Sequence, residues 1–138
     1  MQRRARLNDL REFHSLIFLL VMLTEDLRNK IQEIVEYSIP GAYIVDLVLT
    51  KGKRRVLSIK VDTDKGISLA ECAKISRNVG RELEEEESFS DQYLLEVSSP
   101  GVGHPLKLHR QYTKNVNRHL SVITMAGTIE KGLLKAVD

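Results

Sequence analysis

The stretch SLAECAKISRNVGREL, from Ser68 to Leu83, contains the strongest structural signal in this chain. It opens with a capping box, in which Ser68 and Glu71 each accept a hydrogen bond from the other's backbone at the start of a helix. Apolar side chains then recur three or four positions apart, which places them on one face of an α-helix. The stretch therefore predicts an amphipathic helix that packs on a core through Leu69, Cys72, Ile75, Val79 and Leu83.

Two strands are expected before this helix. Residues 42–50 and residues 56–62 both alternate between apolar and polar side chains, and a turn at residues 51–53 joins them as a hairpin. The expected inner face of the first strand consists of Tyr43, Val45, Leu47 and Leu49. The expected inner face of the second strand consists of Leu57, Ile59 and Val61.

A further helix is expected upstream, and a third strand downstream. Thr24 is a suitable cap, Leu27, Ile31, Ile34 and Val35 form an apolar stripe, and Pro40-Gly41 ends the element. After the acidic run at residues 82–87, residues 93–98 alternate again, with Tyr93, Leu95 and Val97 facing inward. The order α-β-β-α-β predicts an α+β fold, in which two helices cover a small three-stranded sheet.

The remaining residues indicate a linker and the beginning of another unit. Residues 98–103 (SSPGVG) are rich in turn formers, and Pro105 suits the first position of a short helix. Two strands are then expected, one from Arg118 and one over residues 128–137, with a turn at Ala126-Gly127. Since an isolated hairpin is only marginally stable in water, these strands predict the start of a second, all-β domain that is incomplete at residue 138.

Composition describes a globular protein that lacks the marked basic excess typical of general nucleic-acid binders. Apolar residues make up 42% and charged residues 29% of the chain, and the net charge is +2. Residues 1–22 account for all of that excess, because they hold four arginines and only two acids. A general nucleic-acid binder usually has a clearer basic excess, so any RNA contact must come from local patches. Cys72 is the only cysteine, which fits a reducing cytosol.

The N-terminal 22 residues are expected to be an extension upstream of the first helix, and the sequence leaves open whether it is native. The apolar run Leu16–Leu23 is far shorter than the roughly 20 residues that span a bilayer. Asp9 and Glu12 interrupt the basic region before it, which argues against a signal peptide. Met22 precedes a well-formed helix cap and is the expected natural start of a cytoplasmic protein without membrane contact.

The sequence offers no convincing catalytic, cofactor or metal site. Asp62-x-Asp64-x-Gly66 lacks the spacing of a calcium loop and is interpreted as a turn. Ser98, Ser99 and His104 have no acid between Val97 and Thr128 to orient a catalytic base. The four histidines show no metal-ligand spacing with the cysteine. We therefore expect a protein that is not an enzyme and takes no cofactor, metal or small-molecule substrate.

Two basic patches are the candidate contact surfaces. The first is the hairpin tip at residues 51–55, which includes Lys53, Arg54 and Arg55 and is equally interpretable as a charged turn that keeps an edge soluble. The second, called here the basic segment, covers residues 107–118 and carries Lys107, Arg110, Lys114 and Arg118. On a helix, its first three cations share one face, opposite Leu108, Tyr112 and Val116. That basic face suits either RNA phosphates or an acidic protein surface.

Several of these stretches resemble the RimP family of bacterial ribosome maturation factors. The resemblance is carried by LEVSSPG at residues 95–101, PLKLHRQY at 105–112, NVNR at 115–118 and VDTDKGISL at 61–69. It implies a non-catalytic, cytoplasmic factor that binds the small ribosomal subunit, through a ribosomal protein or 16S rRNA, and assists its assembly. The alternative from the residues alone is a general RNA-binding module that uses patches 51–55 and 107–118.

The resemblance also implies a domain layout. We expect an α/β domain at residues 23–99, a linker with a short helix at 100–117, and an incomplete SH3-like barrel at 118–138, in a monomer. Gly103-His104 stands where many members carry Asp-Arg, and Asn117 replaces a usual glycine, which asparagine tolerates in a left-handed turn. The expected contact residues are Lys53, Arg54, Arg55, Ser98, Ser99, Pro100, Gly101, Lys107, Arg110, Lys114 and Arg118.

Overall fold

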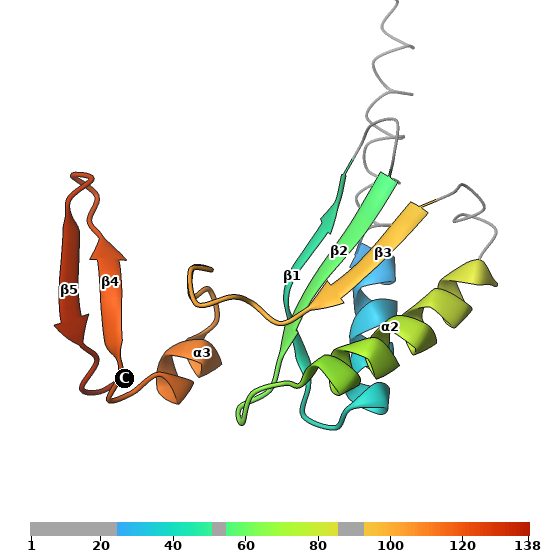
Figure 1. The fold of residues 1–138 in the computed structure, drawn as a ribbon, viewed down its shortest axis with the longest axis horizontal. Coiled ribbons are helices and arrows are strands. Elements are labelled where there is room, and N and C mark those ends of the chain that lie inside the picture. Colours follow the sequence, from blue (N-terminus) through green and yellow to red (C-terminus); the bar gives the residue numbers. More distant parts are fainter. Residues whose placement is uncertain (1–24, 51–54, 86–92) are drawn as a thin grey trace, which may run out of the picture.

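The computed structural model describes residues 25–50, 55–85 and 93–138 (Figure 1). A helix covers residues 25–38, and Pro40 and Gly41 follow it in a turn, as predicted. The other elements are β1 (Tyr43–Leu49), β2 (Arg55–Asp62), α2 (Leu69–Glu84), β3 (Tyr93–Ser98), α3 (His109–Lys114), β4 (His119–Ile123) and β5 (Ile129–Leu133). The predicted order α-β-β-α-β is confirmed, while the predicted extension at residues 1–22 and the cap at Thr24 lie outside the described residues.

The first sheet has the order β1-β2-β3. Strand β2 pairs antiparallel with β1 and parallel with β3, and α2 makes the crossover between the two parallel strands. Both the 25–38 helix and α2 lie on the same side of this sheet, and the other side is left to the chain after β3 (Figure 1). The sheet thus has a helix-covered face and a second face, called here the open face.

The core lies between the helices and the sheet. Helix α2 begins as predicted, since Ser68 caps it and the Ser68 N–H donates to Glu71 Oε2 at 2.7 Å. Tyr93, Leu95 and Val97 of β3 pack against this core from its margin. The fully buried side chains, all with 0% exposure, are Ile31, Val35, Leu57, Ile59, Val61, Ile75, Val79 and Leu83.

One predicted core residue of α2 is wrong. Leu69 is 90% exposed, because it occupies the first helical position, before the stripe has turned toward the sheet. Ile67, just before the cap, packs against the core instead, together with buried Cys72. A hydrophobic residue before the cap often packs near the fourth helical position in this way.

The predicted face of β1 is wrong in its first half. Ile44 pairs with Val61 and Asp46 pairs with Lys60, so Val45 is an extra residue in a β-bulge. The bulge shifts the alternation by one position. Ala42, Ile44 and Leu47 therefore pack on the core, whereas Tyr43 lies across from Asp62 on the open face.

After β3, the chain crosses the open face and ends in a separate hairpin. The short helix does not begin at Pro105 as predicted but at His109, and the side-chain oxygen of Gln111 accepts the N–H groups of Lys107 and Leu108 at 2.8 and 2.9 Å. Strands β4 and β5 pair antiparallel in their own two-stranded sheet. Whether this hairpin belongs to an SH3-like barrel stays a prediction.

The turn before the hairpin confirms the expectation for Asn117. Its φ is 67°, in the left-handed region that asparagine tolerates better than most residues. The Asn117 N–H donates to the carbonyl of Leu134 at 2.7 Å, and the Leu134 N–H donates to the carbonyl of Arg118 at 3.0 Å. This pair of bonds closes the base of the hairpin, so the turn at Asn117 fixes where β4 begins.

Candidate interaction surface on the open face of the sheet

Strand register determines which side chains share the open face. Asp46, Lys60 and Ser98 lie side by side across β1, β2 and β3, and Tyr43 and Asp62 form the neighbouring pair. The Lys60 ammonium donates to Ser98 Oγ at 2.8 Å. Polar and charged groups therefore concentrate at one end of this face, where β2 leads into the turn toward α2.

The basic segment lies across that end of the face, with α3 at its centre (Figure 1). Lys114 makes the most buried contact. Its ammonium donates to both carboxylate oxygens of Asp62 at 2.8 Å and to the carbonyl of Thr63 at 3.0 Å, which occupies all three of its N–H donors. The side chains of Lys114 and Asp62 are only 18% and 11% exposed.

Arg110 makes a second contact, one turn earlier in α3. Its guanidinium donates twice to Asp64, from Nε at 3.1 Å and from a terminal nitrogen at 3.2 Å, in the paired geometry that matches a carboxylate. The same guanidinium lies 3.8 Å from the centre of the Tyr43 ring. The hydrogen bond from Arg110 holds the pKa of Asp64 below its usual value, while burial raises the pKa of the Tyr43 hydroxyl.

Lys107 makes the third contact, just before α3. Its ammonium donates to Asp46 at 3.0 Å, and that hydrogen bond lowers the pKa of the Asp46 carboxyl. Gln111, 2% exposed, lies between Lys107 and Lys114 in the sequence and fixes the backbone at Lys107. The three cations thus meet three aspartates, one from β1, one from the end of β2 and one from the turn after it.

The structure corrects the prediction of an outward basic face. Lys107, Arg110 and Lys114 do share one face of the segment, as predicted, but that face is turned toward the sheet. The side expected to be apolar is partly solvated instead. Tyr112 is 37% exposed, and its hydroxyl donates to the carbonyl of Leu106 at 2.9 Å. The sequence left two partners open for the basic face, RNA phosphates and an acidic protein surface. The chain itself supplies an acidic surface, formed by Asp46, Asp62 and Asp64.

The other predicted contact residues are scattered. Arg55 begins β2 at the far end of the sheet, and Lys53 and Arg54 lie outside the described residues. Arg118 is exposed just before β4. Ser98 receives the bond from Lys60, and Ser99 and Pro100 lead to Gly101, whose carbonyl accepts the His104 N–H at 2.9 Å. The structure brings together the members at 98–101 and 107–114 near one end of the sheet, whereas Arg55 lies at the other end.

The sequence interpretation missed the acidic half of this surface. Asp46 looked like one polar position in an alternating strand, and Asp62 and Asp64 were taken as turn residues. The contacts join positions 46 to 61 residues apart, so no local pattern reveals them. The sequence did contain one signal for these contacts. The segment from Val97 to Thr128 has no acid, whereas Asp62 and Asp64 lie close together at the end of a predicted strand, and opposite charges of this kind can pair.

The described residues show little that points to chemistry. Cys72 is buried in the core, and burial raises the pKa of its thiol, which opposes nucleophilic use. Within residues 25–50, 55–85 and 93–138, no three histidine, cysteine or acidic side chains gather closely enough to hold a metal ion. No helix in those same ranges has the length and apolar character needed to cross a membrane.

Comparison with known proteins identifies the family. Residues 24–103 match the family described as the RimP N-terminal domain. A ribosome maturation factor RimP from Flavobacterium psychrophilum is 36% identical over 114 residues, which cover 80% of this chain and 71% of that protein. Proteins of the same name from Chlorobium chlorochromatii and Cytophaga hutchinsonii are 44% and 39% identical over 59% and 70% of this chain.

The match to those relatives is partial on their side. The aligned residues span 47% of the Chlorobium protein and 59% of the Cytophaga protein. The matched family region nevertheless includes every element of the first sheet, both helices that cover it and the aspartates of the open face. By these matches and this fold, the chain belongs to the RimP family.

Proposed function

We propose that this chain is a ribosome maturation factor that binds the free small ribosomal subunit and assists its assembly without catalysing a reaction. The observation that carries the proposal is the family match over residues 24–103, joined by relatives named ribosome maturation factor RimP at 36–44% identity. We further propose that it acts in the cytoplasm as a monomer.

The surface chemistry supports a binding role. The hairpin of β4 and β5 exposes several apolar side chains, with Val122 at 54%, Ile123 at 73% and Ile129 at 67% exposure. Arg118 at the base of the hairpin, Lys131 within β5 and Lys135 after it are also exposed. A hairpin that exposes both apolar side chains and cations is typical of an element that another macromolecule covers. In this proposal, Arg118 and the turn residues Ser98, Ser99, Pro100 and Gly101 are contact residues.

The alternative is a general RNA-binding module that uses patches 51–55 and 107–118. The ion pairs on the open face argue against a second patch that is always open to RNA, because Lys107, Arg110 and Lys114 already face carboxylates. A phosphate backbone must compete with Asp46, Asp62 and Asp64 for these cations. A factor that recognises a particular particle fits this arrangement better than a constitutive polycation.

Sedimentation distinguishes the two functions. The purified chain is mixed with free small subunits, free large subunits or whole ribosomes at moderate salt and centrifuged through sucrose. The proposed factor co-sediments with small subunits alone and persists when an excess of unrelated RNA is added. Equal binding to all particles, abolished by that RNA, would establish the general RNA-binding module instead.

A matched pair of variants tests the proposed contact. Arg118→Glu is expected to reduce co-sedimentation severalfold, because it reverses a charge beside the hairpin. Lys74→Glu makes the same charge change at an exposed position of α2 and should bind normally. If both variants lose binding equally, the effect is one of net charge, and Arg118 is not a contact residue.

A further inference from the structure

The basic segment is a polycation only when it is released from the sheet. It carries Lys107, Arg110, Lys114 and Arg118, and no acid occurs from Val97 to Thr128. The first three cations are neutralised by Asp46, Asp64 and Asp62, which lie far away in the sequence. Docking therefore removes most of the segment's charge, and undocking restores it. The same three residues cannot bind their aspartates and an external anion at once.

The contacts are graded in a way that permits release. The Arg110–Asp64 pair is exposed, with 43% and 65% side-chain exposure, and Lys107 is 46% exposed. Exposed pairs of this kind contribute little and weaken with salt. Among these three cations, Lys114 is the most buried, with 18% of its side chain exposed. Outer cations can thus meet a competing anion before the inner contact breaks.

The chemistry of the cations indicates which anion competes best. Arg110 presents a paired set of donors to Asp64, and the same planar fork fits the oxygens of a phosphate. Lys107, Arg110 and Lys114 all face aspartates of the open face, so they offer a row of charges along a single side of the segment. A row of charges suits a repeating anion such as an RNA backbone.

We propose that the basic segment is a latch, held shut by Asp46, Asp62 and Asp64, that RNA phosphates open by competing for Lys107, Arg110 and Lys114. This inference rests on the proposed function, since ribosomal RNA supplies the phosphates. Opening frees α3 and the attached hairpin from the sheet. Binding RNA and holding the hairpin in place are therefore opposed, and the aspartates act as built-in competitors of the ligand.

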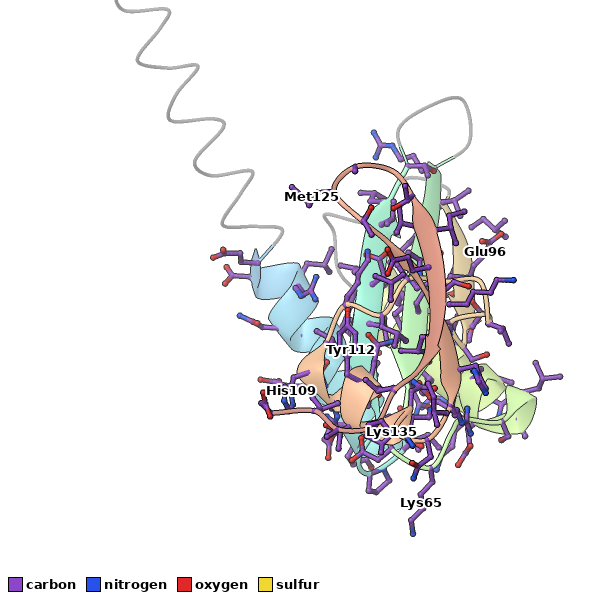
Figure 2. The ribbon with its side chains drawn as sticks, turned by 90° about the vertical axis from the view of Figure 1, so that its left-hand side faces the viewer. Lys65, Glu96, His109, Tyr112, Met125 and Lys135 are labelled. Carbon is purple, nitrogen blue, oxygen red and sulfur yellow. The ribbon has the colours of Figure 1, made fainter. Side chains whose placement is uncertain are left out.

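The latch predicts that replacing one of its aspartates strengthens RNA binding by more than the change in net charge explains. Asp64→Asn tests it, since Asp64 is exposed and its substitution leaves the core intact. The matched control is Glu96→Gln, an exposed carboxylate on the open face across from Ser58. Figure 2 shows Glu96 on the β3 side of the sheet, apart from Tyr112 and His109 of α3.

The experiment measures the affinity of the full chain for a 20-nucleotide single-stranded RNA of mixed sequence at fixed low salt. Asp64→Asn is expected to tighten binding by about two- to fivefold, the range that an exposed ion pair supports, and Asp46→Asn combined with it by more. Glu96→Gln should change affinity less than twofold on the same scale of exposed charges. Equal gains for Asp64→Asn and Glu96→Gln would overturn the latch.

A second arm identifies the ligand class. A polyglutamate peptide of similar charge replaces the RNA, and it is expected to gain little from Asp64→Asn because separate carboxylates do not reproduce the phosphate row. If polyglutamate gains as much as RNA or more, the latch responds to acidic protein, and the RNA proposal is wrong. Because these measurements use no ribosomal particles, they can fail while co-sedimentation with small subunits succeeds, and the reverse.

Discussion

The two faces of the first sheet are held by different forces. Eight side chains are completely buried between the two helices and the helix-covered face, all of them aliphatic. The open face meets the basic segment through three ion pairs, whose side chains range from 11% to 65% exposure. Aliphatic burial is large, non-directional and insensitive to salt, whereas partly exposed ion pairs are small, directional and screened. The helices are thus held firmly on one side of the sheet, whereas the basic segment on the other side is held by contacts that salt or a competing anion can weaken.

The largest expected effect is on the helix-covered face. Leu83→Ala should lower the free energy of unfolding by about 2–5 kcal/mol, because the leucine has no exposed surface and leaves a cavity. Urea melts measure the loss. Leu69→Ala is the control on the same helix and should cost almost nothing, since Leu69 is 90% exposed. Similar midpoints for the two variants would contradict the assignment of the core.

The next effect concerns the deepest contact of the open face. Lys114→Met leaves the Asp62 carboxylate without the ammonium that satisfies both of its oxygens, and it should weaken docking of α3 by about 1–3 kcal/mol. Hydrogen exchange at the α3 amides reports on docking, because a helix of six residues does not persist alone.

Lys131→Met removes a charge from the exposed face of β5 and provides the comparison. Its α3 amides should exchange as in the unaltered chain. If Lys114→Met also leaves exchange unchanged, the Lys114–Asp62 contact does not hold the segment, and the two faces differ less than the geometry indicates.

A smaller effect is expected at the exposed pair. Arg110→Gln should weaken docking less than Lys114→Met does, and the difference from the unaltered chain should shrink as salt is raised. The same exchange measurement at low and high salt tests this. A loss as large as that of Lys114→Met, and independent of salt, would mean that stacking of Arg110 on Tyr43 outweighs its ion pair.

The smallest effect appears in acid. The pKa values of Asp46 and Asp64 are lowered by hydrogen bonds from Lys107 and Arg110, so ionised carboxylates favour the docked state. Their contribution is fully present above the ordinary aspartate pKa of about 3.9 and is lost as the pH falls through the lower pKa of the docked chain.

Carboxyl titrations by NMR check this, with each variant serving as the control for the other. Arg110→Gln should raise the midpoint of Asp64 and leave Asp46 unchanged. Lys107→Gln should do the opposite. Midpoints that move together would show that the segment undocks as a whole when any one contact is lost.

The two faces also differ in how far they could be predicted. Helix α2 and strand β3 were predicted well, because capping at Ser68 and the alternation over residues 93–98 are local signals. Leu69 was misplaced by a boundary effect in the first turn. Lys107, Arg110 and Lys114 lie together as predicted, and their role as contact residues stays a prediction. Their aspartate partners were not predicted, since charge pairing across about 50 residues depends on tertiary structure.

The extra residue at Val45 has a consequence for how tolerant this strand is to change in length. Tyr43 and Asp46 are an odd number of positions apart, and a regular strand would send them to opposite sides. The bulge alone puts both on the side where Arg110 and Lys107 lie. Deleting one residue at the bulge would turn every side chain on one side of the deletion to the opposite face of the sheet. Leu47 would then take the place of Asp46 on the open face. Which side chains of β1 face the core and which face the basic segment therefore depends on the number of residues in the strand as much as on their type.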